Sequence, residues 1–316
     1  MSEWDNDHPE INTALMKTIR LFIKLSRPFF VLGVAVLYAL GVGIAHYLGS
    51  TIDWNAYFLG QAWVSLLQLG TQYLNEYYNA PADQANPNQT VLTGGSGAIG
   101  PGKLPRRIAL VAALTCLAGL ASLTAILIST VKPPPEAYLI MVLAFLGGFF
   151  YSTPPVKLEA SGYGELTTTA LVAFMVPSFA FILQTGQMHR LLAMSGFPLA
   201  ALMMAMLLAF ELPDYATDLK FGKRTLMVRL GWQNGMGMHN ILILSAFLIL
   251  MLARLFNYPW FATIAGLLTL PLGIFQIWQM RNIANGAKPN WDLLTIGALA
   301  LFGSMAYFMA YAFWTH

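Results

Sequence analysis

The chain has 316 residues, of which 57% are hydrophobic and only 10% are charged. Soluble domains carry about 25% charged residues, so this chain has too few charges to cover a water-facing surface. Together with a mean hydropathy of +0.60, this composition excludes a soluble enzyme, a nucleic-acid-binding protein and a disordered chain. The single cysteine, Cys116, also excludes a disulfide framework. The composition therefore indicates an all-α, polytopic membrane protein.

The N-terminal segment differs from the rest of the chain. Met1–Glu10 is acidic and polar and lacks the basic start and cleavage site of a signal peptide. Over residues 11–27, apolar side chains recur at helical spacing with basic ones between them, namely Ile11, Leu15, Ile19 and Phe22 with Lys17, Arg20, Lys24 and Arg27. This pattern predicts a helix lying on an anionic membrane face. We therefore predict a cytoplasmic or interfacial segment over 1–27 and a single transmembrane domain over 28–316.

The rest of the chain is dominated by apolar stretches. Because a helix needs about 20 mostly apolar residues to cross a bilayer, we expect nine transmembrane helices. They run over roughly 28–48, 57–78, 108–130, 136–153, 165–186, 191–212, 237–256, 259–280 and 293–314. All basic residues except Lys132, Arg190 and Arg254 then fall on one side, which predicts a cytoplasmic N-terminus and an outside C-terminus. The long loops share the cytoplasmic side, so we expect an active site that faces the cytoplasm.

Polar side chains follow the second predicted span. Asn75, Asn79 and Asp83 are spaced i, i+4, i+8, so they share one face if the helix continues. Pro81 favours a kink or an end of that helix near Asn79.

A second polar set follows the sixth predicted span. Glu211, Asp214 and Asp218 are spaced i, i+3, i+7 and also share a face. Carboxylates at the membrane boundary are expensive and usually functional. Mg²⁺ binds through one or two carboxylates together with substrate phosphates. The two sets therefore predict a Mg²⁺ site at one end of the helices.

Basic side chains occupy the same two loops and suit phosphate oxygens, namely Lys103, Arg106, Arg107, Lys220, Lys223 and Arg224. Carboxylates for Mg²⁺ beside such cations describe a site for a diphosphate. The glycine run Thr93–Gly97 could cradle phosphate through its backbone amides, but it does not match the Walker spacing, so we expect a flexible loop. Two simpler interpretations stay open: loop charges that pair with one another, and interhelical asparagines.

These motifs resemble those of the UbiA superfamily of intramembrane prenyltransferases. The family's N-D-x-x-D-x-x-x-D motif is matched by Asn75–Asp83. Its D-x-x-x-D motif is matched by Asp214–Asp218, with the tail G-K-R-T-L-x-V-R-L-G at 222–231. Residues 151–157 and 164–166 resemble the family's loop between helices four and five, and Arg27–Pro28 resembles the start of helix one. The branch most similar in appearance uses 1,4-dihydroxy-2-naphthoate as its acceptor, and benzoate, homogentisate, chlorophyllide and lipid-glycerol acceptors stay open.

The resemblance implies Mg²⁺-dependent transfer of a polyprenyl group from its diphosphate to an aromatic quinone precursor at the lipid bilayer. The implied metal ligands are Asn75, Asn79, Asp83, Asp214 and Asp218. The implied diphosphate contacts are Lys103, Lys223, Arg224 and Arg27. The implied catalytic residues are Tyr151, Lys157 and Asp83. Rings that would stabilise an allylic cation are Tyr77, Tyr78, Phe150 and Tyr151. Glu165 would orient Lys157 or cap the fifth helix.

The match departs from the family pattern at one position. Asn79 stands where the family has an aspartate, and Asn75-Glu76 replaces the opening Asn-Asp. A neutral amide still offers a carbonyl oxygen, but it removes a negative charge and weakens Mg²⁺ binding. Either Glu76 or Asp83 compensates for the lost charge, or this chain binds its metal and diphosphate differently. Two other functions remain open: a cation-coupled transporter, whose helix-end carboxylates line an ion pathway, and a non-catalytic prenyl-lipid binder.

Overall fold

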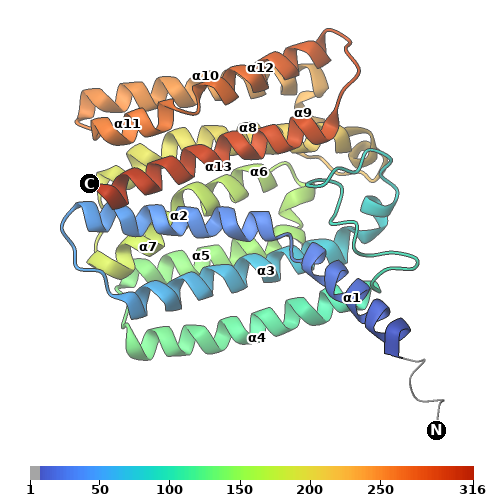
Figure 1. The fold of residues 1–316 in the computed structure, drawn as a ribbon, viewed down its shortest axis with the longest axis horizontal. Helices are drawn as coiled ribbons and strands as arrows, with labels where there is room; N and C mark the ends of the chain where they lie inside the picture. Colours follow the sequence, from blue (N-terminus) through green and yellow to red (C-terminus); the bar gives the residue numbers. More distant parts are fainter. Residues whose placement is uncertain (1–7) are drawn as a thin grey trace.

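A computed structural model of the chain describes residues 8–316, and in them helices account for all of the regular structure except an isolated bridge between Ile99 and Leu104. The helices lie side by side in one bundle (Figure 1). In chain order they are α1 (His8–Leu25), α2 (Pro28–Tyr47), α3 (Trp54–Gln84), α4 (Arg106–Thr130), α5 (Pro135–Ser152), η1 (Leu158–Ala160), α6 (Gly164–Thr169), η2 (Ala170–Met175), α7 (Val176–Thr185), α8 (Arg190–Lys220), α9 (Leu226–Leu230), α10 (Trp232–Leu252), η3 (Ala253–Phe256), α11 (Trp260–Leu267), α12 (Leu270–Ala284) and α13 (Trp291–Thr315). The prediction of an all-α protein is confirmed.

Within the described residues, 8 helical segments are long and apolar enough to cross a membrane. They coincide with all of the predicted spans except 57–78, which lies inside α3. That helix is continuous but carries a polar face, which lowers its hydropathy. The integral membrane character is thus supported, whereas the count of nine spans and the orientation of the termini stay predictions.

Pro81 does not end α3, so the predicted end of the helix near Asn79 is wrong. Proline lacks the N–H that would bond the carbonyl one turn earlier, that of Tyr77. Arg106 replaces this donor: its Nε lies 2.5 Å from the Tyr77 carbonyl oxygen, and its guanidinium lies 4.1 Å from the centre of the Tyr77 ring. Helix α3 therefore continues to Gln84 and keeps Asn75, Asn79 and Asp83 on one face.

Three apolar cores hold the bundle together. One joins α2, α3, α4, α5 and α7, a second joins α2, α8, α10 and α13, and a third joins the end of α1 to α3 and α4. Helix α2 packs against both α7 and α13, and Gly41 permits its close approach to α7, because a Cβ there would collide with the Pro177 carbonyl. Helices α2, α3, α5 and α8 thereby surround a common interior space.

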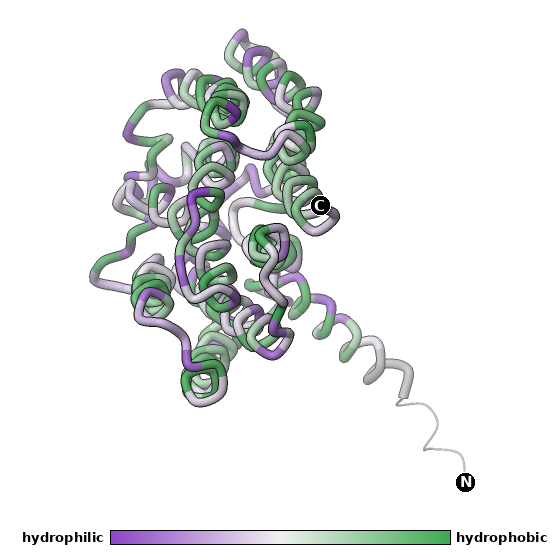
Figure 2. Tube along the Cα trace, turned by 90° about the vertical axis from the view of Figure 1, so that its left-hand side faces the viewer, coloured by the Kyte–Doolittle hydropathy of each residue, from purple (hydrophilic) through white to green (hydrophobic). Residues whose placement is uncertain are grey.

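Helix α1 stands away from the bundle for most of its length (Figures 1 and 2). Its apolar side chains Leu15, Met16 and Ile23 are exposed, whereas its last turn is anchored by the buried Leu25. An exposed apolar stripe beside basic residues is typical of a helix at a membrane surface. The predicted segment over 1–27 stays a prediction, and its first seven residues lie outside the described part of the chain.

Candidate active site

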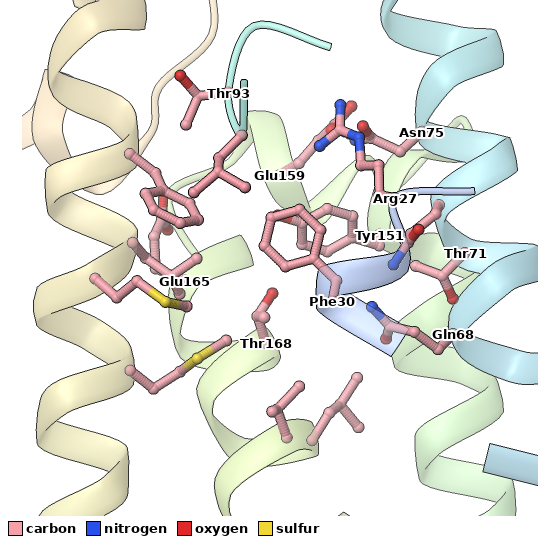
Figure 3. A pocket seen from close by; sticks show the side chains of 18 of the residues that line it. Arg27, Phe30, Gln68, Thr71, Asn75, Thr93, Tyr151, Glu159, Glu165 and Thr168 are labelled. Atoms are coloured by element: carbon pink, nitrogen blue, oxygen red, sulfur yellow. The ribbon is translucent and has the colours of Figure 1, made fainter. Parts of the chain in front are cut away.

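A cavity of about 310 Å³ lies among α2, α3, α5, α6 and α8. All five predicted metal ligands line it: Asn75, Asn79, Asp83, Asp214 and Asp218. Elsewhere its wall is largely apolar and includes Val34, Leu67, Val172, Met203 and Phe302. The cavity therefore joins a polar mouth to an apolar interior (Figure 3).

On the α3 side, a carboxylate from a loop completes the polar mouth. Glu159 of η1 is buried, and its Oε2 accepts hydrogen bonds from Nδ2 of Asn75 at 2.5 Å and from Nδ2 of Asn79 at 2.6 Å. Burial raises the pKa of Glu159, although the charge of Lys223 and the hydrogen bond from Asn79 oppose that rise. Glu159 thus places a carboxylate beside the position where Asn79 lacks one.

Sequence reasoning missed Glu159 as a site residue. It follows two prolines in an irregular loop, so no helical periodicity indicates where its side chain points. The one available signal was its place inside the loop that resembles the family's loop between helices four and five.

Glu76 has a different partner from the one expected. Its Oε1 accepts from Arg27 Nη2 and from the Ser96 backbone N–H, each at 2.6 Å, and its Oε2 accepts from Ser96 Oγ at 2.7 Å. Glu76 is buried and is absent from the cavity wall. The hypothesis that Glu76 supplies the charge missing at Asn79 is therefore wrong. Glu76 instead fixes Arg27, which does line the cavity.

The glycine run Thr93–Gly97 is largely buried, so the expectation of a flexible loop is wrong. The Gly94 N–H donates to Asp214 Oδ2 at 3.1 Å, and a Cβ on Gly95 would lie 2.6 Å from Asp83 Oδ2. Asn86, which precedes the run, donates to Asp214 Oδ1 at 2.6 Å. Both glycines have positive φ, 72° and 81°, so residues without a side chain suit this turn. The run packs between the two acidic helix ends.

On the α8 side, two carboxylates hold the G-K-R-T-L tail. Glu165 Oε1 accepts from the Leu226 N–H at 2.8 Å, and Glu211 Oε2 accepts from the Met227 N–H at 2.9 Å. These amides belong to the first turn of α9, where backbone N–H groups lack helical partners. Glu165 therefore binds α9, and neither of its expected roles is seen.

Holding α9 also positions Lys223, which lines the cavity 3.8 Å from Asp218 Oδ1. Burial alone would lower the pKa of Lys223. The nearby carboxylates of Glu159, Asp218 and Asp83 raise it by more, so the pKa of Lys223 lies above its ordinary value. Lys223 therefore remains a cation at neutral pH.

The remaining predicted residues divide between the cavity wall and the surface. Tyr151 and Arg27 line the cavity, whereas Lys103, Lys157 and Arg224 are exposed and lie outside its wall. Lys103 sits in the turn before α4, and Lys157 begins η1 with a positive φ that directs the chain into that short helix. The roles predicted for these three side chains stay predictions.

The expected aromatic lining is also only partly seen. Of the four predicted rings, Tyr151 lines the cavity, but Tyr77, Tyr78 and Phe150 do not. Tyr77 instead lies against Arg106. The other rings on the wall are Phe29, Phe30, Phe210 and Phe302, and those of Phe30 and Phe210 meet edge to face with centroids 6.1 Å apart.

A family model described as "UbiA prenyltransferase family" matches residues 34–299. The chain belongs to this family. It is therefore a prenyltransferase, and the resemblance inferred from its motifs is confirmed.

Curated relatives agree with this membership. The 1,4-dihydroxy-2-naphthoate octaprenyltransferase of Mycobacterium tuberculosis is 29% identical over 84% of this chain and 91% of its own length. The enzyme of the same name from Mycobacterium leprae is 25% identical over 92% of this chain and 100% of its own length. The 2-carboxy-1,4-naphthoquinone phytyltransferase of Arabidopsis thaliana is 31% identical over 44% of this chain, and the match spans only 38% of that relative.

Solved structures share the fold. A UbiA homologue from Archaeoglobus fulgidus bound to GPP and Mg²⁺ has a TM-score of 0.66 at 15% identity and covers 94% of this chain and 100% of its own. A digeranylgeranylglyceryl phosphate synthase has a TM-score of 0.61 at 14% identity and covers 94% of this chain and 98% of its own.

Proposed function

We propose that this UbiA-family prenyltransferase transfers a polyprenyl group from polyprenyl diphosphate to an aromatic quinone precursor, 1,4-dihydroxy-2-naphthoate or a related ring, with Mg²⁺ as cofactor and from the cytoplasmic side. The observation that carries this proposal is one cavity whose mouth gathers both acidic helix ends while its interior is largely apolar. Such a cavity matches a substrate with a charged head and a hydrocarbon tail. The names of the full-length relatives support the choice of acceptor.

The residues at the mouth suit Mg²⁺. Asp83, Asp214 and Asp218 offer carboxylate oxygens. Asn75 and Asn79 turn Nδ2 toward Glu159, which leaves their carbonyl oxygens for a cation. Mg²⁺ is usually bound through one or two carboxylates and takes much of its coordination from substrate phosphates and water, so these few side-chain ligands suit it.

The chain's own residues support each step of the reaction. The bond between prenyl C1 and the diphosphate oxygen breaks, and its electron pair leaves with diphosphate toward the cations Lys223 and Arg27, where charge develops. When bound, Mg²⁺ neutralises part of that charge. The rings of Phe30 and Tyr151 on the cavity wall can stabilise the allylic cation. A carbon of the electron-rich acceptor then bonds to C1, and the ring loses a proton, or CO₂ if the attacked carbon bears a carboxylate.

Glu159 argues against the alternative of a non-catalytic binder. That alternative rested on the charge missing at Asn79, and a buried carboxylate lies 2.6 Å from the Asn79 amide nitrogen. The mouth therefore keeps a carboxyl group beside the position where the motif itself lacks one.

The test is prenyl transfer by the purified protein in detergent, with radiolabelled polyprenyl diphosphates, Mg²⁺ and a panel of aromatic acceptors. We expect product with a dihydroxynaphthoate, and its loss in EDTA. Diphosphate binding without product from any acceptor would support a binder, and neither binding nor product would favour a transporter.

A further inference from the structure

The interior of the cavity holds a group of polar side chains that the diphosphate site does not use. Gln68, Thr71 and Gln72 come from α3 and Thr168 comes from α6, and all four line the cavity. In Figure 3, Thr71 and Gln68 lie on the same side of α3 as Asn75, facing the cavity, and successively farther from the mouth. We call these four residues the polar belt.

Gln72 is the most informative member of the polar belt. Its side chain is 8% exposed, and neither Nε2 nor Oε1 has a hydrogen-bond partner among the described residues. A buried amide without partners is destabilising, and such groups in native proteins call for an explanation. Because Gln72 lies on the cavity wall, a polar group of a bound ligand can supply the missing partners.

Two further features fit a ligand at this depth. Helix α5 has Gly148 opposite Thr71, and a Cβ there would lie 2.6 Å from Thr71 Oγ1, so the glycine leaves room for the hydroxyl. Thr168 of α6 and Tyr151 of α5 also line the cavity. Donors and acceptors therefore come from two walls of an otherwise apolar space.

The position of the polar belt along α3 distinguishes it from the diphosphate site. At a rise of about 1.5 Å per residue, Gln72 and Gln68 lie roughly 4.5 and 10.5 Å from Asn75 along the helix axis, away from Asp83. A prenyl diphosphate with its phosphates at the mouth has C1 just inside it. An acceptor ring at the depth of the polar belt would then lie beside C1, with its oxygen substituents near these polar side chains.

We propose that the polar belt is the acceptor subsite and that Gln72 binds the oxygen substituents of a hydroxylated aromatic acid. Its Oε1 accepts from a ring hydroxyl, and its Nε2 donates to a ring oxygen. These bonds hold the nucleophilic carbon toward C1. A prenyl chain offers Gln72 no partner, so the hydrocarbon tail is not the ligand of this subsite. The inference rests on the proposed function and names the residues that select its second substrate.

The test replaces Gln72 with methionine, which keeps the length of the side chain and removes the amide. Gln61→Met is the matched control, because Gln61 lies on the same helix outside the cavity wall and donates to Ser65. The purified full-length proteins are titrated with 1-hydroxy-2-naphthoate, a fluorescent acceptor analogue, without Mg²⁺ or prenyl diphosphate. The KM values for acceptor and for prenyl diphosphate are then measured separately.

We expect Gln72→Met to bind the analogue about 10-fold more weakly, the effect of losing one or two net hydrogen bonds. The KM for the acceptor should rise similarly, with the KM for prenyl diphosphate within twofold and with Gln61→Met unchanged. Thermal unfolding of Gln72→Met without ligand should occur at the wild-type temperature or above, because the substitution removes an unpartnered buried amide.

Unchanged binding of the analogue in Gln72→Met, or an equal rise in both KM values, would overturn the acceptor subsite while leaving the proposed function intact. Conversely, a wild-type protein that transfers no prenyl group, yet loses analogue binding in Gln72→Met, would overturn the proposed function and retain the subsite.

Discussion

The two helix ends at the mouth of the cavity carry their negative charge in different ways. Helix α8 supplies Asp214 and Asp218 from its own sequence. Helix α3 supplies two amides and one carboxylate, and the further carboxylate on that side is Glu159, from a loop distant in the chain. The comparison teaches that the carboxyl groups of a site can come from any segment that folds into the pocket. A motif on one helix can therefore lack an acidic residue while the site still contains a carboxyl group at that place.

The largest effect should come from the helix that provides its own carboxylates. Asp214→Ala and Asp218→Ala should each lower kcat/KM for prenyl transfer by at least about 100-fold, because removing one electrostatic stabiliser of developing charge typically costs that much. The exposed acid Glu136 at the start of α5 is the control, and Glu136→Ala should leave kcat/KM within twofold. Equal, small losses in all three variants would contradict the assignment of α8 to the site.

The next largest difference in activity should separate variants of two neighbouring basic residues after α8, Lys223 and Arg224. Lys223 lines the cavity whereas Arg224 is exposed. Lys223→Met should therefore raise the KM for prenyl diphosphate and lower kcat/KM by about 30-fold or more, and Arg224→Met should change both by less than about threefold. Steady-state kinetics at fixed ionic strength checks this pair. A larger loss in Arg224→Met would show that the diphosphate binds outside the cavity.

A smaller effect should follow from disturbing the glycine run that packs between the two helix ends. Gly95→Ala adds a Cβ that would lie 2.6 Å from Asp83 Oδ2, at a φ of +81°. We expect about a 10-fold loss of kcat/KM as Asp83 is displaced, a loss of the size that misplacing a catalytic group can cause.

Gly102→Ala is the matched control for this variant, because Gly102 has a similar φ of +70° but no atom within 4 Å of a built Cβ. It should lower stability with little loss of activity. If the two variants lose activity equally, backbone strain rather than the contact with Asp83 explains the effect.

The helical parts of the site could be predicted because a helix fixes which residues share a face. The spacing of Asn75, Asn79 and Asp83, and that of Glu211, Asp214 and Asp218, sufficed to place each set on one side of its helix. The segments of eight predicted spans were also recovered, because apolar stretches of sufficient length are visible in composition alone.

The parts that could not be predicted depend on contacts between segments far apart in the chain. Pro81 indicated a kink or an end in α3, and the donor that bonds the Tyr77 carbonyl in its place, Arg106, comes from the next helix. The partners of Glu76 and Glu159 depend on where two irregular loops fold, and no periodicity constrains such loops. The burial of the glycine run likewise comes from Asp83 and Asp214, which lie on different helices.

The most direct measurement compares variants in which the carboxyl group is removed from Glu159 and introduced at position 79 of α3. Glu159→Gln should lower kcat/KM about 10- to 100-fold and raise the Mg²⁺ concentration needed for half-maximal rate. Adding Asn79→Asp to that variant restores a carboxylate at the mouth, and we predict recovery of most of the lost activity and of the Mg²⁺ dependence. In the wild-type background, Asn79→Asp should bring no comparable gain, because it places two carboxylates together. A double variant no more active than Glu159→Gln alone would contradict the claim that Glu159 supplies the charge that Asn79 lacks.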